Sequence, residues 1–454
     1  MLFFRRKTAK PTIIQRADHC ISRKDIDPDA LKVLYRLSSL GHNAFLVGGS
    51  VRDLLLGRTP KDFDVGTDAR PNEIRRIFRN CFLVGRRFRL AHIVFGKKVI
   101  ETATFRKAPD SNAVQDEHGL YQSEDNTFGT PEEDARRRDF TVNGLFYDIK
   151  TFAVIDYVDG LKDLKSKTLR CIGDPAIRFR EDPVRMMRAV RFAAKLGFTI
   201  CPADVKAIKK YAGDLVNASV SRLCEEIQRL FVRGNTCHSI RLAYDLGVLR
   251  ALLPRLCAWL DTREDRRNAL WHSLAALDAL ADECDPSPAV AMAALYWPMV
   301  HEEVLAAQAA TPAGGRRPNE RFLRKTAAQK ALAPIVAAYR LPRAVWMTAV
   351  DILELSARFQ VMPRPEVQRD IRFVTHGIFP EALLGARWLA GLLPDAPWKL
   401  DAWQQFHATL CPVRTNRNGD PQPPLNPHSR KARRRRPRHR KPRDTPKTDA
   451  PAQE

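Results

Sequence analysis

The sequence predicts an α+β protein in which a small domain with a mixed sheet precedes an all-α region and a basic tail. Three observations support this prediction. Short apolar runs alternate with helical stretches up to about residue 169, as in domains where strands and helices interleave. From about residue 183 to 410, apolar residues recur with the period of a helix. The last segment has almost no large apolar residues, so it cannot bury a core.

These changes divide the 454-residue chain into five segments. The length allows two or three domains. We expect an N-terminal extension, a mixed-sheet head, a helical neck, a helical body and a disordered Arg-rich tail. Their predicted bounds are 1–25, 26–169, 170–255, 256–410 and 411–454.

The charge balance predicts a polyanionic partner. The formal net charge is +24, which favours binding to nucleic acid or to an anionic membrane surface. No apolar run approaches the roughly 20 residues that a membrane-spanning helix needs, so we expect no transmembrane segment. The nine cysteines lack the close spacing of a zinc site, which favours reduced thiols in a cytoplasmic protein.

The elements of the head follow one another in chain order. Asp27 and Pro28 have the residue types of an N-cap and a first helical position, and Gly41 is the expected end of that helix. The polar stretch 107–133 predicts a long mobile loop. The expected strands are "AFLV", "FDVGT", "CFLVG", "LAHIVFG" and "KKVIETATF", with a hairpin at Gly96–Lys97, and the expected helices are "VRDLLLG" and "RPNEIRRIFRN".

The stretch "DFDV" carries the first candidate for chemistry. Asp62 and Asp64 are two residues apart, and such residues point to the same side of a strand. Neighbouring carboxylates suit a hard cation such as Mg2+, and Glu101 on a later strand could supply a third oxygen ligand. The alternative is a charged, solvated edge strand.

A glycine turn precedes this acidic pair. Gly48 and Gly49 lie between a predicted strand and a predicted helix, where backbone N–H groups can approach a phosphate. Ser50 could cap that helix or donate to a phosphate oxygen, and Arg52 could add a charge-assisted contact. The turn and the acidic pair together predict one pocket for phosphate and metal.

Two later segments combine acids with arginines. In "RRRDFTVN", Arg138 could hold a phosphate or stack on a base and Asp139 could accept from a ribose hydroxyl, or Asp139 could cap a helix beside solvated arginines. In "EDPVRMMRAVRF", one helix face could present donors and acceptors to a base edge, or form an ion pair at a wet surface. The residues of that face are Asp182, Arg185, Arg188 and Arg191, whereas Met186, Met187 and Val190 are expected in the core.

Two basic features suit RNA. Arg86, Arg87 and Arg89 surround Phe88, a combination that fits backbone contact with base stacking, or else a solvated strand edge. The tail predicts a salt-dependent arm for phosphates, with a nuclear targeting signal or an anionic-lipid patch as alternatives. Its central arginines are Arg433, Arg434, Arg435 and Arg436.

Taken together, the motifs resemble those of a known family. Gly48 and Gly49 followed by "DFDV" are similar to the signature of the polymerase-β-like nucleotidyltransferases. "LVGGSVRDLLLG", "RRDFTVN" and "EDPVRMMRAVRFAAKLGF" resemble the bacterial group of tRNA CCA-adding enzymes and poly(A) polymerases, over roughly residues 20–255. "LVGRRFRLAHI", the lead-in "ISRKDIDPDALKVLYRL" and the Arg-rich tail resemble the poly(A) polymerases within that group.

The resemblance implies a polymerase-β-like nucleotidyltransferase head that adds AMP from ATP to RNA 3′ ends without a template, a reaction that promotes mRNA decay. Asp62 and Asp64 would hold Mg2+, and Glu101 and Asp139 would complete the catalytic acids. The RNA-decay machinery is a candidate partner. The implied nucleotide-binding residues are Gly48, Gly49, Ser50, Arg52, Arg138, Asn143, Asp182, Arg185, Arg188 and Arg191.

Two other functions fit the same residues. The first is CCA addition to tRNA, which shares the whole catalytic set. The second is a non-catalytic RNA-binding protein with a decayed site, which the intact acidic pair disfavours.

Overall fold

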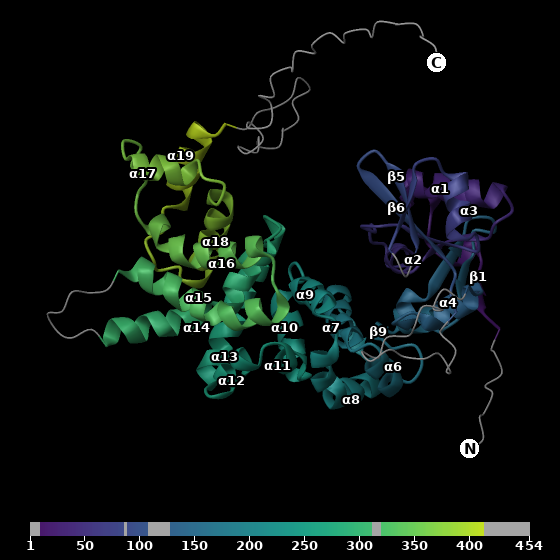
Figure 1. Cartoon of the computed structure of the whole chain (residues 1–454), viewed down its shortest axis with the longest axis horizontal. Coiled ribbons are helices and arrows are strands. Elements are labelled where there is room, and N and C mark those ends of the chain that lie inside the picture. The colour runs from purple at the N-terminus through teal and green to yellow at the C-terminus, as the bar shows by residue number, and fades with distance from the viewer. Residues whose placement is uncertain (1–9, 86–88, 108–127, 311–318, 413–454) are drawn as a thin grey trace, which may run out of the picture.

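The structure is a computed structural model that describes residues 10–85, 89–107, 128–310 and 319–412. A head built on a sheet lies at one end of the molecule, and helices lead away from it through a neck to a body at the other end (Figure 1). This arrangement confirms the predicted α+β fold class. The predicted tail from residue 413 onward and the predicted loop between 108 and 127 lie outside the described residues.

The head contains an eight-stranded mixed sheet with the order β1-β8-β7-β2-β3-β6-β5-β4. β3 and β6 are parallel, and the other neighbours are antiparallel. The predicted hairpin at Gly96 is present, since it joins two paired antiparallel strands. The strands are β1 (Thr12–Ile14), β2 (Ala44–Val47), β3 (Asp64–Thr67), β4 (Cys81–Val84), β5 (Leu90–Phe95), β6 (Lys98–Thr104), β7 (Leu145–Asp148) and β8 (Val154–Asp156).

Helices cover one face of this sheet along most of its width. α1 packs on β2 and β3, and α3 packs on β4 and β5. The opposite face is covered only in part among the described residues: Val47, Phe105, Ala135 and Phe146 form a small apolar cluster over the β2–β7 half. The helices of the head are α1 (Pro28–Ser39), α2 (Gly49–Leu55), α3 (Pro71–Ile77), α4 (Pro131–Arg137) and α5 (Gly160–Lys165).

The start of α1 follows from its sequence. The Asp27 carboxylate accepts the backbone N–H groups of Asp29 (2.8 Å) and Ala30 (3.4 Å), which have no partner inside the helix. Pro28 takes the first helical position, where a missing N–H costs nothing. The buried side of α1 then carries Ala30, Val33, Leu34 and Leu37.

Two segments differ from the expectation. The predicted N-terminal extension contributes β1, which pairs with β8 at the edge of the head sheet, so part of it belongs to the head. α4 begins inside the predicted polar loop 107–133. Its short sequence has a strong start signal, because Thr130 and Glu133 form a capping box around Pro131.

The neck and body are almost entirely helical, as predicted. Met186, Met187 and Val190 of α7 are fully buried, which confirms their place in the core. Among the described helices, none is long and apolar enough to cross a membrane. The elements are β9 (Thr168–Leu169), α6 (Pro175–Glu181), α7 (Val184–Leu196), β10 (Thr199–Ile200), α8 (Pro202–Tyr211), α9 (Val220–Arg229), α10 (Thr236–Asp245), α11 (Val248–Leu252), α12 (Pro254–Asp261), α13 (Glu264–Ala279), α14 (Pro288–Ala309), α15 (Glu320–Tyr339), α16 (Arg343–Leu355), α17 (Gln368–Val374), α18 (Phe379–Leu392) and α19 (Leu400–Leu410).

Candidate active site

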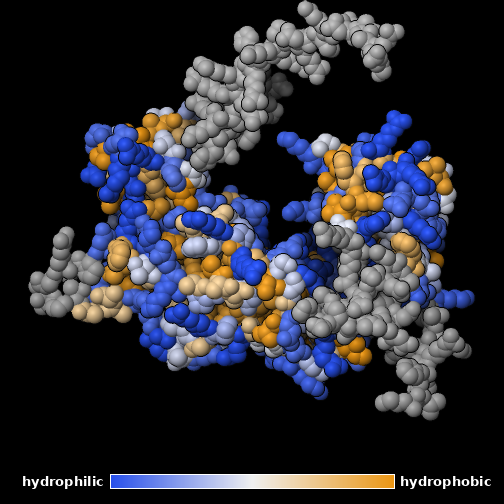
Figure 2. Space-filling view, viewed as in Figure 1, coloured by the Kyte–Doolittle hydropathy of each residue, from blue (hydrophilic) through white to orange (hydrophobic). Residues whose placement is uncertain are grey.

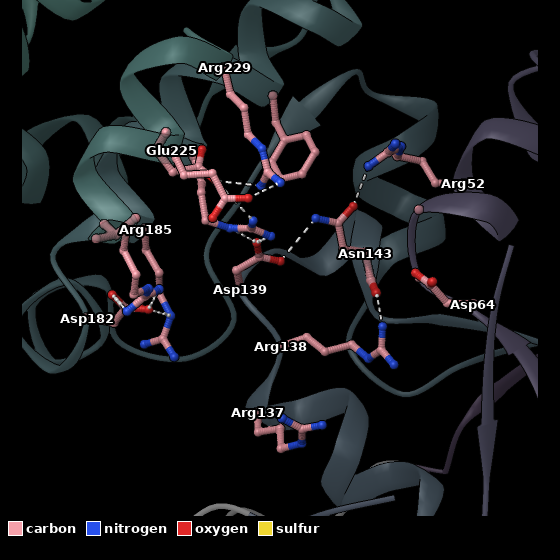
Figure 3. Close-up of a pocket in the computed structure, with 17 residues that line it drawn as sticks. Arg52, Asp64, Arg137, Arg138, Asp139, Asn143, Asp182, Arg185, Glu225 and Arg229 are labelled. Carbon is pink, nitrogen blue, oxygen red and sulfur yellow. Dashed lines mark hydrogen bonds and ion pairs between the residues drawn. The ribbon is translucent and has the colours of Figure 1, made fainter. Parts of the chain in front are cut away.

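A cavity of about 590 Å³ lies where the head meets the neck (Figure 3). Its walls come from the β2–α2 turn, the start of β3, the segment after α4, and the neck helices α7 and α9. Seven arginines and five carboxylates line it, so the cavity is strongly charged with an excess of positive groups. The lining residues are Gly48, Gly49, Arg52, Asp64, Arg137, Arg138, Asp139, Asn143, Asp182, Val184, Arg185, Arg188, Phe192, Arg222, Glu225, Glu226 and Arg229.

The predicted glycine turn forms part of the wall. Gly48 has φ = +72°, a conformation that residues with a Cβ rarely adopt. A Cβ at Gly48 would lie 2.7 Å from Nη1 of Arg138, so the missing side chain also makes room for that guanidinium. The turn therefore brings bare backbone and a cation together at the cavity.

Arg52 lies behind the turn in a fixed position. It is buried, and its guanidinium donates to Asp53 (2.8 Å) and to the side chain of Asn143 (2.5 Å). Ser50 differs from the expectation: its buried hydroxyl donates to the Val47 carbonyl (3.0 Å). Ser50 does not line the cavity, because its position in α2 turns the hydroxyl back onto the preceding strand.

The three predicted acids lie at one edge of the cavity. The register of β3 with β6 pairs Val65 with Thr102, so the residues one step earlier, Asp64 and Glu101, are neighbours on the same face. The pKa of Asp64 is raised to about 6, chiefly by burial and also by the nearby charges of Glu101 and Asp62, although Arg138 opposes the change. Asp64 lines the cavity, whereas Asp62 and Glu101 are exposed beside it.

This donor set fits a divalent cation. Carboxylate oxygens are the ligands that Mg2+ prefers, and a cation would offset both the burial and the repulsion from Glu101 and Asp62 that raise the pKa of Asp64. Within the described residues, no three His, Cys, Asp or Glu side chains are already arranged around a point that could hold a metal ion. The three acids are thus neighbours whose side chains would have to turn toward a shared cation.

Asp134 holds two arginines at the cavity from the side of α4. Its buried carboxylate accepts from Arg137 (2.8 and 2.6 Å) and Arg138 (3.2 and 2.9 Å). Arg178 of α6 donates to the backbone carbonyls of the same two arginines, at 2.7 and 2.9 Å. Arg138 is therefore fixed from both the head and the neck.

Asp139 joins the head to the neck. Its Oδ2 accepts from Nε (2.8 Å) and Nη2 (2.5 Å) of Arg188, and its Oδ1 accepts from the Phe140 backbone (2.8 Å) and the Asn143 side chain (3.0 Å). Burial opposes ionisation, but Arg188 and these donors overcome it and hold the pKa of Asp139 below its usual value. The four bonds occupy the acceptor sites of the carboxylate in this structure, and the contact of Asp139 with a ribose stays a prediction.

Asp182 and Arg185 lie at the far side of the cavity, between α6 and α7. Arg222 of α9 binds both oxygens of Asp182, at 2.9 and 2.8 Å. Nε of Arg185 is 3.9 Å from Asp182, and Arg185 donates to the Arg178 carbonyl at 2.9 Å. Asp182 and Arg185 are thus close together, as expected, but the residue that binds the Asp182 carboxylate is Arg222 of another helix.

α9 contributes residues that were not predicted. Its Glu226 accepts from Arg191 (3.0 Å) and Arg229 (3.1 Å), and it lies 3.7 Å from Arg188. Arg191 therefore supports the wall without lining the cavity, unlike the expectation. The signal was present in "SRLCEEIQR", where Arg222, Glu225, Glu226 and Arg229 recur at helical spacing.

The predicted RNA-binding arginines can be placed only in part. Arg89 is exposed just before β5. The others lie outside the described residues: Arg86, Arg87, Arg433, Arg434, Arg435 and Arg436.

Comparison with known proteins accounts for this combination of parts. Residues 44–170 match the family described as the Poly A polymerase head domain. A poly(A) polymerase I from Escherichia coli O6:H1 is 45% identical over 295 residues, which are 63% of this chain and 63% of that protein.

By this match, the head of the chain belongs to the Poly A polymerase head domain family.

A second family match lies in the neck. Residues 197–260 match the description "Probable RNA and SrmB- binding site of polymerase A", a range that includes α9. A CCA-adding enzyme from Geobacillus stearothermophilus is 35% identical over 261 residues, 54% of this chain and 63% of that enzyme. The solved structure of the Bacillus stearothermophilus CCA-adding enzyme with CTP is 28% identical, with a TM-score of 0.57 over 85% of this chain and 84% of that one.

The poly(A) polymerase head match includes the glycine turn, Asp64 and Asp139. The chain spans less than two thirds of the length of the Escherichia coli relative that it matches, and the match covers 63% of this chain.

Proposed function

We propose that this chain is a template-independent polynucleotide adenylyltransferase that adds AMP from ATP to RNA 3′ ends. The observation that carries the proposal is the meeting of the glycine turn, Asp64 and the arginine-rich neck in one cavity. Sequence identity supports the choice of product, since it is 45% to a poly(A) polymerase I and 35% to a CCA-adding enzyme.

Asp62, Asp64 and Glu101 would hold Mg2+ in this proposal. When bound, the metal would activate the attacking hydroxyl and stabilise the leaving pyrophosphate. The raised pKa of Asp64 supports the assignment, because a buried carboxylate that also has Glu101 and Asp62 beside it is stabilised in its charged form by a cation.

The protein's own residues would position both substrates. The triphosphate would lie against the glycine turn, where Arg52 and Arg138 are fixed by Asn143 and Asp134. Fixed donors cost little reorganisation when the 3′ hydroxyl attacks the α-phosphorus and pyrophosphate leaves.

The adenine would meet Asp182 and Arg185. An acid and an arginine can together offer an acceptor and donors to a base edge, which makes a nucleic-acid template unnecessary. Arg222 would fix the orientation of Asp182 through its two bonds. Asp139 becomes a positioning residue, because it acts on the cavity through Arg188 and Asn143.

The proposal extends to the cellular role. Polyadenylation that promotes RNA decay in the cytoplasm, with the RNA-decay machinery as partner, rests on the resemblance in sequence. The neck match described as an RNA and SrmB-binding site supports RNA and protein contacts there. CCA addition remains the alternative, supported by the fold shared with a CCA-adding enzyme.

The test combines activity with RNA binding. The double substitution Asp62→Ala, Asp64→Ala should abolish AMP incorporation while the affinity for RNA changes little, because these acids would hold the metal and repel, not attract, the phosphates of RNA. The control variant is Asp68→Ala, an acid at the other end of β3 whose partners are Asn43 and His42. Unchanged incorporation by the double variant would contradict the assignment, and loss of RNA binding alone would favour a non-catalytic RNA-binding protein.

A further inference from the structure

Half of one face of the head sheet has no covering element among the described residues. β4, β5 and β6 turn buried residues such as Cys81, Ile93 and Ile100 toward α3 and the main core. Their other face is apolar yet exposed. We call this surface the open sheet face; it comprises Phe82 (63% exposed), Val84 (46%) and Val99 (42%), with the half-buried Leu90, His92 and Val94.

The open sheet face lies toward the gap between the head and the body. Figure 1 places β5 and β6 on that side of the head, and Figure 2 shows hydrophobic atoms gathered over the same region. Contiguous exposed apolar area on a protein usually marks a binding surface.

Strand register connects this surface to the acids of the cavity. Phe82 pairs with His92, and His92 pairs with Glu101. Glu101 in turn is the neighbour of Asp64, which pairs with Val47 on β2. One row of side chains therefore runs across the sheet from the covered half, through Asp64, to the exposed ring of Phe82.

The character of the row changes along its length. Glu101 and Asp64 occupy the end at the cavity, and His92 Nε2 lies 3.8 Å from Glu101. β4 and β5 contain no acidic residue, and the exposed Arg89 stands immediately before β5. An aromatic and aliphatic surface beside a cation suits a nucleobase with its phosphate, and does not suit a cation or an acidic peptide.

We propose that the open sheet face is a stacking platform for the RNA substrate. A base upstream of the 3′ end would stack on the Phe82 ring. The inference rests on the proposed function, because it assumes that the 3′ end lies at Asp64. The row of side chains is continuous from Asp64 to Phe82, which favours RNA as the occupant. An RNA chain whose 3′ end lies at Asp64 must leave the cavity over a neighbouring surface.

The distance sets which nucleotide is involved. Phe82 and Asp64 are separated by three strand spacings, which amount to ~14 Å at ~4.8 Å each. Stacked nucleotides advance ~3.4 Å each, so Phe82 lies several nucleotides from the reacting end. A dinucleotide primer would therefore reach Asp64 without touching Phe82, whereas a longer RNA would meet both.

The experiment compares two primers on the full chain. ApA and an oligoadenylate of about 12 nucleotides, which is within the ~4–16-nucleotide range of single-strand sites, are extended with ATP and Mg2+. Phe82→Ala should raise the KM for the oligoadenylate roughly tenfold with little change in kcat, and should leave both constants for ApA unchanged. Phe82→Tyr keeps the aromatic face and should behave like the wild type, whereas Phe82→Leu should behave like Phe82→Ala.

The matched control is Phe322→Ala on α15, because Phe322 is 65% exposed in the body. It should leave the KM for both primers unchanged. The Kd of fluorescent oligoadenylate without ATP gives a readout that does not need activity, and Phe82→Ala should weaken that binding to the same extent.

Several results would overturn the platform. Equal KM and Kd for Phe82→Ala and the wild type would exclude a contact between Phe82 and RNA. A wild-type result for Phe82→Leu would show that apolar area, not stacking, is recognised, and a lower mass for Phe82→Ala in sedimentation would identify a second copy as the occupant. If the proposed function itself were wrong, the wild type would extend neither primer, which distinguishes that outcome from failure of the platform.

Discussion

The ion pair between Asp139 and Arg188 crosses from the head to the neck, and the substitution Arg188→Met removes its positive partner. Breaking a buried pair from one side costs ~3–5 kcal/mol, because a buried charge is left without compensation. Asp139 would keep the Phe140 backbone and the Asn143 side chain as donors, at 2.8 and 3.0 Å. We therefore expect the low end of that range, about 3 kcal/mol of local stability.

Hydrogen exchange of the Phe140 backbone amide measures this loss of local stability. The Phe140 N–H donates to the Asp139 carboxylate, so its protection reports how firmly that carboxylate is held. A loss of about 3 kcal/mol corresponds to a roughly 100-fold lower protection factor at pH 7. The control is Arg136→Met in α4, whose exposed pair with Glu132 should be worth less than ~1 kcal/mol.

A second substitution separates the charge from the packing. Asp139→Asn combined with Arg188→Met removes the uncompensated carboxylate, so it should recover part of the lost protection. If Arg188→Met changes Phe140 protection no more than Arg136→Met does, the proposed role of the ion pair is refuted. Lower protection in the double variant than in Arg188→Met alone would refute it equally.

Three further predictions address the cavity and the tail. Gly48→Ala should raise the KM for ATP at least tenfold with the fold intact. The reason is that Gly48 has a positive φ and that a Cβ there would lie 2.7 Å from Nη1 of Arg138. A wild-type KM would show that the turn does not face the nucleotide. Without divalent cations, Asp64→Asn should unfold in urea with a free energy about 1–3 kcal/mol higher than the wild type at pH 8 and equal to it near pH 4. The reason is that the folded pKa of about 6 exceeds the usual 3.8, so ionisation of Asp64 destabilises the fold as the pH rises through this window; a constant difference across the range would contradict this. Truncation at about Leu425 should weaken RNA binding and flatten the dependence of log Kd on log salt, and an unchanged slope would show that the arginines beyond it do not contact phosphates.

Much of the fold follows from short-range patterns in the sequence. Asp27, Pro28 and Gly41 bracket α1 through capping and a left-handed exit, which are local interactions. α4 was not predicted, because its seven residues are mostly charged and their apolar period is too short to detect. The place of β1 could not be predicted either, since its only signal is a pairing with β8 about 140 residues later in the chain.

The residues of the candidate site likewise divide into those that short motifs predicted and those that they did not. Gly48, Gly49 and Asp64 were predicted because each belongs to a short motif with its own chemistry. Ser50 and Arg191 were expected to face the nucleotide, but the nearby Val47 carbonyl and the distant Glu226 take up their polar groups. Arg222 could not be assigned from spacing alone, because its partner Asp182 is 40 residues away.

We propose that this cavity adds AMP repeatedly to RNA without a template. The most direct measurement is the product ladder from a short 5′-labelled RNA that is offered ATP, CTP, GTP or UTP one at a time. We predict a long ladder with ATP and little extension with the other three nucleotides. Addition of two C residues with CTP, followed by a single A when ATP is supplied, would contradict this claim.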